Sequence, residues 1–125
     1  MSYRRPGKYP DNWMGIATQV KQDANWHCIR CGEYNDLRSG HVLTVHHFDG
    51  QKDNCQWWNL LALCQRCHLS VQGRVDPEQP YMFEHAEWIK PYVAGFYADK
   101  YLGEDLTRAE IMKRLDELLA MERLA

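Results

Sequence analysis

Two Cys-x-x-Cys pairs constrain this chain more than any other feature of its sequence. The first pair is Cys28 and Cys31, and the second is Cys64 and Cys67. Each pair can supply two thiolates from one tight turn, and four thiolates complete the tetrahedral shell of a structural zinc ion. Residues 32–63 lie between the pairs, a longer insertion than the roughly 15–20 residues of a plain zinc ribbon. We therefore expect one zinc ion to join the two ends of an inserted structural unit.

Two other uses of these thiols compete with the zinc site. Cys55 could replace one of the four ligands, although a small core residue or a free thiol is the better interpretation. The run from Cys64 to His68, Cys-Gln-Arg-Cys-His, also matches the attachment motif of c-type haem. Haem would leave Cys28 and Cys31 without a role, and the N-terminus lacks the apolar core of a secretory signal. We therefore favour zinc.

The length of 125 residues fits one small domain, and 45% apolar residues can form a modest core. No apolar run approaches the ~20 residues that span a bilayer, so we expect no membrane association and a cytoplasmic location. Residues 1–75 carry nine Lys and Arg against six Asp and Glu, a balance of +3, and residues 76–125 carry six against eleven, a balance of −5. A nucleic-acid surface therefore belongs to the first part. Residues 1–10, which combine basic side chains with two prolines, are expected to form a flexible basic arm.

The N-terminal part contains short elements around the cysteines. Residues 12–24 show helical periodicity and begin next to Asp11 or Asn12, either of which could cap the helix. Residues 41–48 show alternating side-chain character and contain β-branched side chains, and this pattern predicts a strand. A helix is expected from residues 67–73.

The C-terminal part, residues 76–125, is predicted to be a helical extension that packs on the core. Its first apolar face, within 82–102, is interrupted by Pro91. Thr107 and Glu110 form a capping box that starts one last helix. The alternative for this acidic extension is a homodimer or protein-partner surface.

Histidines gather within the segment that the cysteines enclose and at its end. His46 and His47 are adjacent, so at the end of a strand one can bind a metal while the other faces a bound water. His68 directly follows Cys67, a predicted zinc ligand. We expect the zinc site, which joins the two ends of the insertion, to bring His68 close to His46 and His47. Gln72 lies one helical turn after His68 and shares its face. His46, His68 and Gln72 could therefore form an open metal site beside His47.

These residues closely resemble the HNH endonucleases, the ββα-metal nucleases, in the zinc-containing branch that has four cysteine ligands. The matching positions run from Trp26 to Gly73 and include His46-His47, Asn59 and Cys64-x-x-Cys67-His68. The resemblance implies an α+β fold: a small ββα-metal (HNH) core clamped by a four-cysteine zinc site, with an N-terminal helix and a C-terminal helical extension.

The resemblance also implies residue roles in metal-dependent hydrolysis of DNA phosphodiester bonds. His47 is the general base that activates water, and Asn59 braces the loop. His46 and His68 hold one catalytic divalent ion, which could be Mg²⁺, Mn²⁺, Ni²⁺ or Zn²⁺. Gln72 departs from the family pattern, where a third His is often found, and this changes the expected metal preference.

The expected partner is DNA, most simply a duplex. The alternatives are a zinc-organised DNA-binding module without catalysis and an adaptor that acts through the helical extension. Basic and aromatic side chains that could contact DNA are found throughout residues 1–75. They are Arg30, Arg38, Lys52, Trp57, Arg66 and Arg74.

Overall fold

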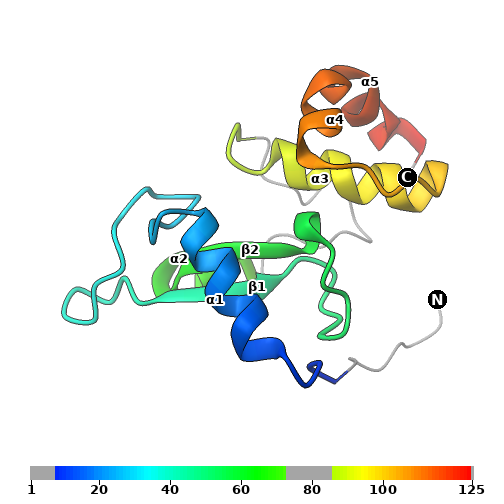
Figure 1. Ribbon diagram of the computed structural model, residues 1–125. Helices are drawn as coiled ribbons and strands as arrows, with labels where there is room; N and C mark the ends of the chain where they lie inside the picture. The colour runs from blue at the N-terminus through cyan, green and yellow to red at the C-terminus, as the bar shows by residue number, and fades with distance from the viewer. Residues whose placement is uncertain (1–7, 73–85, 125) are drawn as a thin grey trace.

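The computed structural model describes residues 8–72 and 86–124 (Figure 1). Within these ranges the chain is a small α+β protein with one two-stranded sheet. Its elements, in order, are helix α1 (Trp13–Asp23), strand β1 (Leu43–His47), the 3-10 turn η1 (Trp57–Asn59), strand β2 (Leu60–Cys64), and the helices α2 (Gln65–Gln72), α3 (Lys90–Tyr97), η3 (Ala98–Leu102), α4 (Arg108–Lys113), α5 (Leu115–Leu119) and η4 (Ala120–Leu124).

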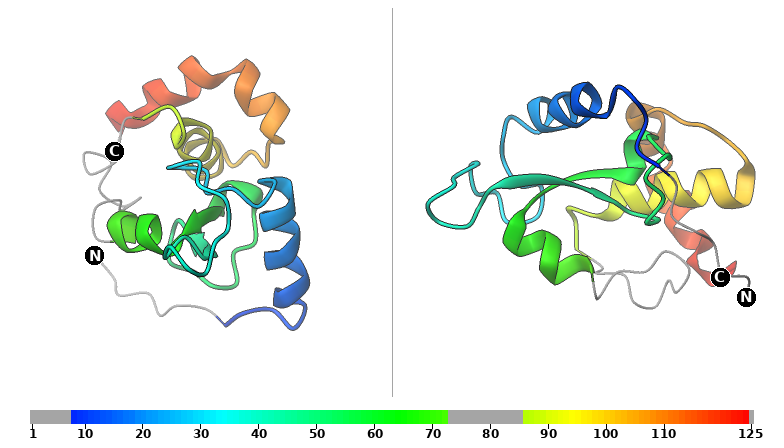
Figure 2. Two further views of the ribbon diagram at one scale, coloured as in Figure 1. Left: turned by 90° about the vertical axis from the view of Figure 1, so that its left-hand side faces the viewer. Right: turned by 90° about the horizontal axis from the view of Figure 1, so that it is seen from below.

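The two strands form an antiparallel pair in which Leu43 lies opposite Cys64 and His47 lies opposite Leu60. Helix α2 follows β2 without a loop, and the backbone N–H of Gln65 donates to the carbonyl of Val42 at 2.8 Å. Helices α1 and α2 lie on opposite sides of the hairpin (Figure 2). Because neighbouring strand residues face opposite sides, His46 points toward α2 while His47 points toward α1.

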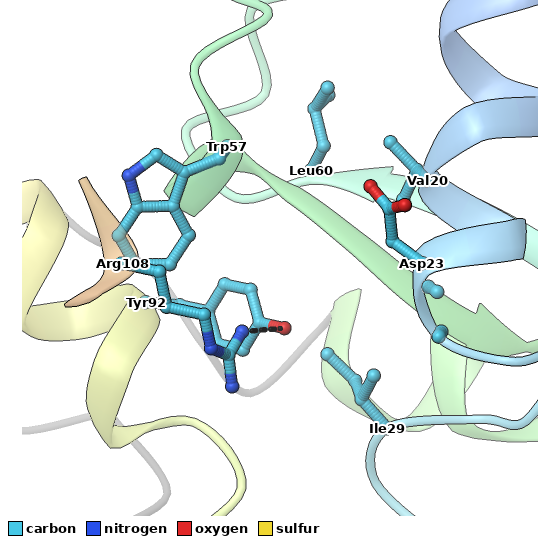
Figure 3. Close-up of a pocket in the computed structure, with 9 residues that line it drawn as sticks. Val20, Asp23, Ile29, Trp57, Leu60, Tyr92 and Arg108 are labelled. Carbon is cyan, nitrogen blue, oxygen red and sulfur yellow. Dashed lines mark hydrogen bonds between the residues drawn. The ribbon is translucent and has the colours of Figure 1, made fainter. Parts of the chain in front are cut away.

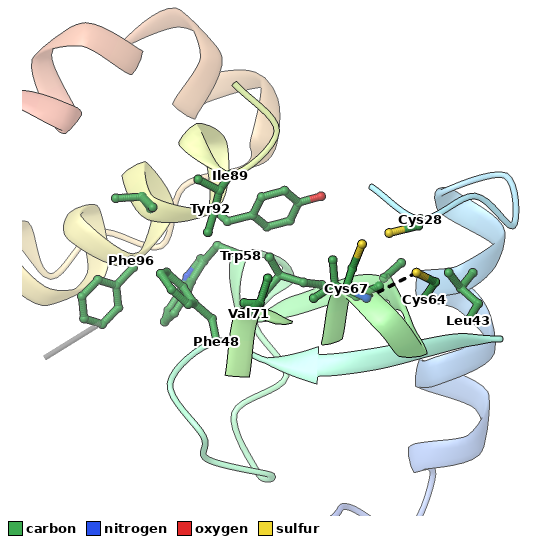
Figure 4. Close-up of a cluster of buried hydrophobic side chains, with 14 of the residues drawn as sticks. Cys28, Leu43, Phe48, Trp58, Cys64, Cys67, Val71, Ile89, Tyr92 and Phe96 are labelled. Atoms are coloured by element: carbon green, nitrogen blue, oxygen red, sulfur yellow. Dashed lines mark hydrogen bonds between the residues drawn. The ribbon is translucent and has the colours of Figure 1, made fainter. Parts of the chain in front are cut away.

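The main core joins the hairpin to the C-terminal helices. Strand β2 is buried along its whole length, and its side chains pack with Phe48, Trp58 and residues of α3 (Figure 4). Helix α3 passes so close to Trp58 that a Cβ on Gly95 would lie 2.5 Å from the Cβ of Trp58. Only glycine permits this approach. A second cluster on the far side of α3 contains Ala94, Ala98, Ile111 and Leu118 and fixes α4 and α5.

Several local expectations differ from the structure. Asn12 occupies the N-cap of α1, but its side chain makes no capping hydrogen bond. Pro91 does not interrupt a longer helix, since it lies in the first turn of α3, where proline has no N–H to lose. The capping box of Thr107 and Glu110 is present. The helix that it starts is not continuous, because the backbone breaks at Arg114 between α4 and α5.

Within the described ranges, no helix has the length and apolar character that a membrane crossing requires.

Candidate functional site

The four cysteines predicted to bind metal lie together. Their Sγ atoms are all within 4.8 Å of one another, and those of Cys31 and Cys64 are 3.8 Å apart. Two thiolates bound at about 2.3 Å to one tetrahedral ion lie roughly 3.8 Å apart, so the arrangement fits zinc. The first pair sits in a turn that Gly32 completes with a φ of 78°, and the second pair spans the junction of β2 and α2 (Figure 4). The cysteines are therefore positioned to bind one metal ion.

Hydrogen bonds to sulfur orient the thiol cluster. The backbone N–H of Cys31 donates to Sγ of Cys28, and that of Cys67 donates to Sγ of Cys64, each at 3.5 Å. Nη1 of Arg30 donates to Sγ of Cys67 at 3.5 Å. Burial raises the pKa of Cys67 to about 12, although the hydrogen bond from Arg30 opposes that shift. Metal binding at neutral pH must therefore displace a proton from this thiol.

Cys55 is a half-buried free thiol outside this cluster, so it is not one of the four clustered ligands. Burial raises its pKa, which keeps the thiol protonated and poorly nucleophilic.

A pair of imidazoles forms on the opposite side of the hairpin from α1. Nδ1 of His46 lies 3.1 Å from Nε2 of His68, which is hydrogen-bond distance between the two rings. Two nitrogens bound at about 2.0–2.1 Å to one ion lie roughly 3.0–3.4 Å apart, so this separation suits two ligands of a shared ion. Strand β1 supplies one nitrogen and the first turns of α2 supply the other. The structure thus brings together the two histidines that the sequence placed in one metal site.

Thr44 determines which nitrogen of His68 is available. Its hydroxyl donates to the carbonyl of Leu63 at 2.7 Å and lies 2.8 Å from Nδ1 of His68. A hydroxyl has one proton, so Nδ1 of His68 must donate to the Thr44 oxygen. This tautomer leaves a lone pair on Nε2 of His68, the nitrogen that faces His46. Such a partner on the far ring nitrogen is typical of metal-binding histidines.

Both imidazoles of the pair are held in the neutral form. Burial, together with the nearby rings of His68 and His47, lowers the pKa of His46 to about 4. Burial also lowers the pKa of His68. Neutral rings keep the lone pairs that a metal needs. Among the described residues, Nε2 of His46 is buried without a hydrogen-bond partner.

His47 neighbours His46 in β1, but its ring points to the other side of the hairpin, toward α1, and is largely covered. Its side chain is 7% exposed, and its ring centroid is 4.9 Å from that of Trp13 and 5.7 Å from that of Tyr9. Burial lowers the pKa of His47, while the Asp49 carboxylate and a hydrogen bond with the Lys52 backbone oppose that shift. Nε2 of His47 has no hydrogen-bond partner in the described part of the chain. The ring is therefore neutral at neutral pH and has a free lone pair.

Asn59 is fully buried and braces the loop that follows His47. Its Oδ1 accepts from the backbone N–H of Asp49 at 2.8 Å, and its Nδ2 donates to the carbonyl of Asn54 at 2.8 Å. The Asn59 carbonyl accepts from the N–H of Phe48 at 2.9 Å. Asp49 itself makes an Asx turn, since its Oδ1 accepts from the N–H of Gln51. These bonds fix the end of β1 and with it the position of His47.

The residues predicted to contact DNA have varied surroundings. Arg30 is turned to the thiol cluster, and Nε1 of Trp57 donates to the carbonyl of Leu106 at 2.8 Å. The guanidinium of Arg66 lies against Gly40: a Cβ added to that glycine would be 3.2 Å from Nε of Arg66. Their contacts with DNA stay predictions, as do those of three further side chains. Arg38 and Lys52 are exposed, whereas Arg74 lies outside the described residues.

The metal-site prediction for Gln72 also stays untested, because α2 includes its backbone but its side chain is not described. Among the described residues, the group of three or more His, Cys, Asp or Glu side chains close enough to hold one metal ion consists of the four cysteines. His46 and His68 form a pair, so any ion between them needs further ligands from water, from substrate or from a side chain that is not described, such as Gln72.

A separate cavity of about 550 Å³ opens between α1, β2 and α3 (Figure 3). Leu60 and Ile29 line it, with Asp23 at one side. At the other side, the guanidinium of Arg108 lies over the rings of Trp57 and Tyr92 and donates to the Tyr92 hydroxyl. Sequence patterns did not indicate this cavity, because its walls come from distant segments.

Comparison with known proteins gives one partial similarity. The chain is 37% identical over 60 residues to the Zorya protein ZorE of Escherichia coli strain Crooks. The similar segment covers 48% of this chain and 16% of that relative, so the chain corresponds to a small portion of the relative's length. No family model matches the chain, and no solved structure matches it.

Proposed function

We propose that this chain is a metal-dependent endonuclease of the HNH type that hydrolyses phosphodiester bonds in DNA. The observation that carries the proposal is the 3.1 Å separation between Nδ1 of His46 and Nε2 of His68. The order of elements supports it, since an antiparallel pair of strands leads directly into a helix, as a ββα-metal core requires. The thiol cluster next to this unit fits the structural zinc ion of the four-cysteine branch.

In this proposal, His46 and His68 hold the catalytic divalent ion, and Thr44 keeps His68 in the required tautomer. Such an ion supplies Lewis acidity, which stabilises the negative charge that develops on the phosphate oxygens. Two imidazoles fill only part of the coordination shell of such an ion. Imidazole nitrogens favour softer ions such as Ni²⁺ or Zn²⁺, whereas Mg²⁺ and Mn²⁺ would depend on oxygen ligands from water and substrate phosphate to complete the site.

His47 is the general base of the proposed reaction. A neutral imidazole can take a proton from water as the water attacks phosphorus, and the lowered pKa keeps the ring neutral at physiological pH. The ring is aimed by its backbone contact with Lys52, and the loop is held by Asn59. Asn59 therefore acts as a positioning residue.

The similarity to ZorE indicates that the two proteins share one segment of about 60 residues. Because that segment is 16% of the relative, it assigns neither the chemistry nor the substrate of this chain. The proposed activity rests on the arrangement of the histidines.

The test is a plasmid-nicking assay with Mg²⁺, Mn²⁺ or Ni²⁺. The unaltered chain should convert supercoiled DNA to nicked or linear forms. His47→Ala should lower the rate by roughly 10²–10⁴-fold because the general base is lost. His27→Ala is the control, since His27 is exposed and bonds the carbonyl of Asn25. Failure of the unaltered chain to cut DNA with any of these ions would reject the proposal.

A second candidate is a zinc-organised DNA-binding module without catalysis. The coverage of His47 favours it, because a buried Nε2 cannot reach water in this conformation. This candidate requires DNA retention that His47→Ala and added Mg²⁺ leave unchanged, together with no nicking.

A further inference from the structure

Aromatic rings from the start of the described chain cover the proposed general base. Tyr9 stacks on Trp13, with ring centroids 4.9 Å apart and planes inclined by 28°. Both rings also contact the imidazole of His47. Trp13 is the first residue of α1, whereas Tyr9 precedes the helix and is 48% exposed. His47 is therefore covered by two rings: an inner ring, Trp13, which belongs to α1, and an outer ring, Tyr9, which lies outside any helix.

Lys52, in the loop after β1, also contacts the outer ring, Tyr9. Its Nζ lies 5.0 Å from the centroid of Tyr9. The backbone of Lys52 bonds His47. The ammonium thus links this loop to the N-terminal segment across the face of Tyr9. A cation–π contact at an exposed position is weak, so an anion can displace it.

We propose that Tyr9 is a removable cap on His47, held in place by Lys52 and opened by a DNA phosphate. This inference rests on the proposed nuclease function, because it explains how a covered base meets its substrate. A phosphate oxygen attracts an ammonium more strongly than an aromatic face does. As Lys52 moves to the phosphate, Tyr9 loses the contact that holds it. Trp13 stays in place and keeps the imidazole oriented.

While Tyr9 covers His47, the cap should also lower the chemical reactivity of the imidazole. Without DNA, Nε2 of His47 is shielded from water and from reagents in solution. Removing Tyr9 or its contact with Lys52 should therefore expose His47 even when no DNA is present. This consequence can be measured without any nuclease activity.

The experiment compares the rate at which diethyl pyrocarbonate modifies His47, read by peptide mass spectrometry, in the full chain without DNA. Tyr9→Ala should raise that rate roughly three- to ten-fold, because it removes the stacked ring. Lys52→Gln should raise it roughly two- to five-fold, because it removes the cation that holds the ring. Tyr34→Ala is the matched control, since Tyr34 is an exposed tyrosine that contacts His27 and not His47.

Equal modification rates in the unaltered chain, Tyr9→Ala, Lys52→Gln and Tyr34→Ala would overturn the cap. Melting temperature and zinc content are measured in each variant, so a rise caused by unfolding is recognised and counts against the cap.

Plasmid nicking by the same proteins separates the cap from the proposed function. The cap predicts that Tyr9→Ala nicks DNA faster than the unaltered chain at limiting DNA. Faster modification with slower nicking would overturn it, because Tyr9 would then assist the reaction. Faster modification with no nicking by any protein, the unaltered chain included, would sustain the cap and reject the nuclease function.

Discussion

At the scale of single residues, the account depends on which ring nitrogens are free. Thr44 fixes the proton of His68 on Nδ1, and burial keeps His46 neutral. The spacing of the histidines in the sequence predicted that His46 and His68 meet, and the structure places them together. The sequence could not indicate the role of Thr44, since a strand threonine is ordinarily a β-former, and its bond to His68 exists only after α2 folds back.

Replacing Thr44 with valine tests this orientation. The change keeps the side-chain shape and removes the oxygen that fixes the His68 tautomer. We expect the affinity for Mn²⁺ or Ni²⁺ at the imidazole pair to fall by roughly 10–100-fold, the usual effect of losing such a supporting bond. Isothermal titration calorimetry on protein with its zinc site filled gives the affinity.

Thr18→Ala is the control for that change, because the exposed Thr18 hydroxyl donates to the carbonyl of Met14 within α1. Equal metal affinities in Thr44→Val and Thr18→Ala would show that the tautomer of His68 is set by something other than Thr44.

The covering of His47 is a second residue-scale feature that the sequence did not indicate. The composition of residues 1–10 predicts a flexible basic arm, of which residues 1–7 lie outside the described residues. In the described part, Tyr9 stacks on Trp13 beside His47. A ring contact between residue 9 and residue 47 is set by tertiary structure, and neither periodicity nor spacing encodes it.

At the scale of elements, patterns located α1, β1 and α2 but misjudged their ends, and they did not identify β2, Leu60–Cys64, as a strand. The strand expected over residues 41–48 is β1, Leu43–His47. The capping box predicts one continuous last helix, but that helix breaks at Arg114, whose guanidinium pairs with both Glu104 and Glu117. Such pairings across a bend depend on the packing of α4 and α5 against α3, which a local capping box cannot specify.

The contact between α3 and η1 predicts a sharp steric effect. Gly95→Ala places a methyl group 2.5 Å from the Cβ of Trp58, and neither backbone can retreat without disturbing the core. We expect the free energy of unfolding to fall by about 1–3 kcal/mol or more. Chemical denaturation measures the change.

Gly15→Ala serves as the comparison, because a Cβ at Gly15 in α1 meets no atom within 4 Å. Alanine there should leave stability unchanged or raise it by up to ~1 kcal/mol, as helix propensity predicts. Equal effects of the two substitutions would contradict the close approach of α3 to Trp58.

At the scale of the whole molecule, two connections hold the site together. The thiol cluster ties the segment before β1 to the start of α2, and the core around Trp58 ties the hairpin to the C-terminal helices. Apolar stripes in residues 76–125 predicted a packed extension, but not that a glycine would set its distance from the hairpin.

Metal removal should therefore affect the whole fold. Cys67→Ser should lower bound zinc below one ion per chain and lower the melting temperature, because the ion links segments far apart in the sequence. Cys55→Ser is the matched control, since Cys55 lies outside the cluster. Elemental analysis and thermal unfolding measure both effects. Full zinc content in Cys67→Ser, or an equal loss in Cys55→Ser, would contradict the assignment of the four ligands.

The central claim is that His46 and His68 bind one divalent ion together, and a crystal grown with Mn²⁺ tests it most directly. The anomalous difference map should show a peak roughly 2.2 Å from both Nδ1 of His46 and Nε2 of His68, and that peak should vanish in His68→Ala. A map with no peak between these nitrogens, while zinc fills the four-cysteine site, would contradict the claim.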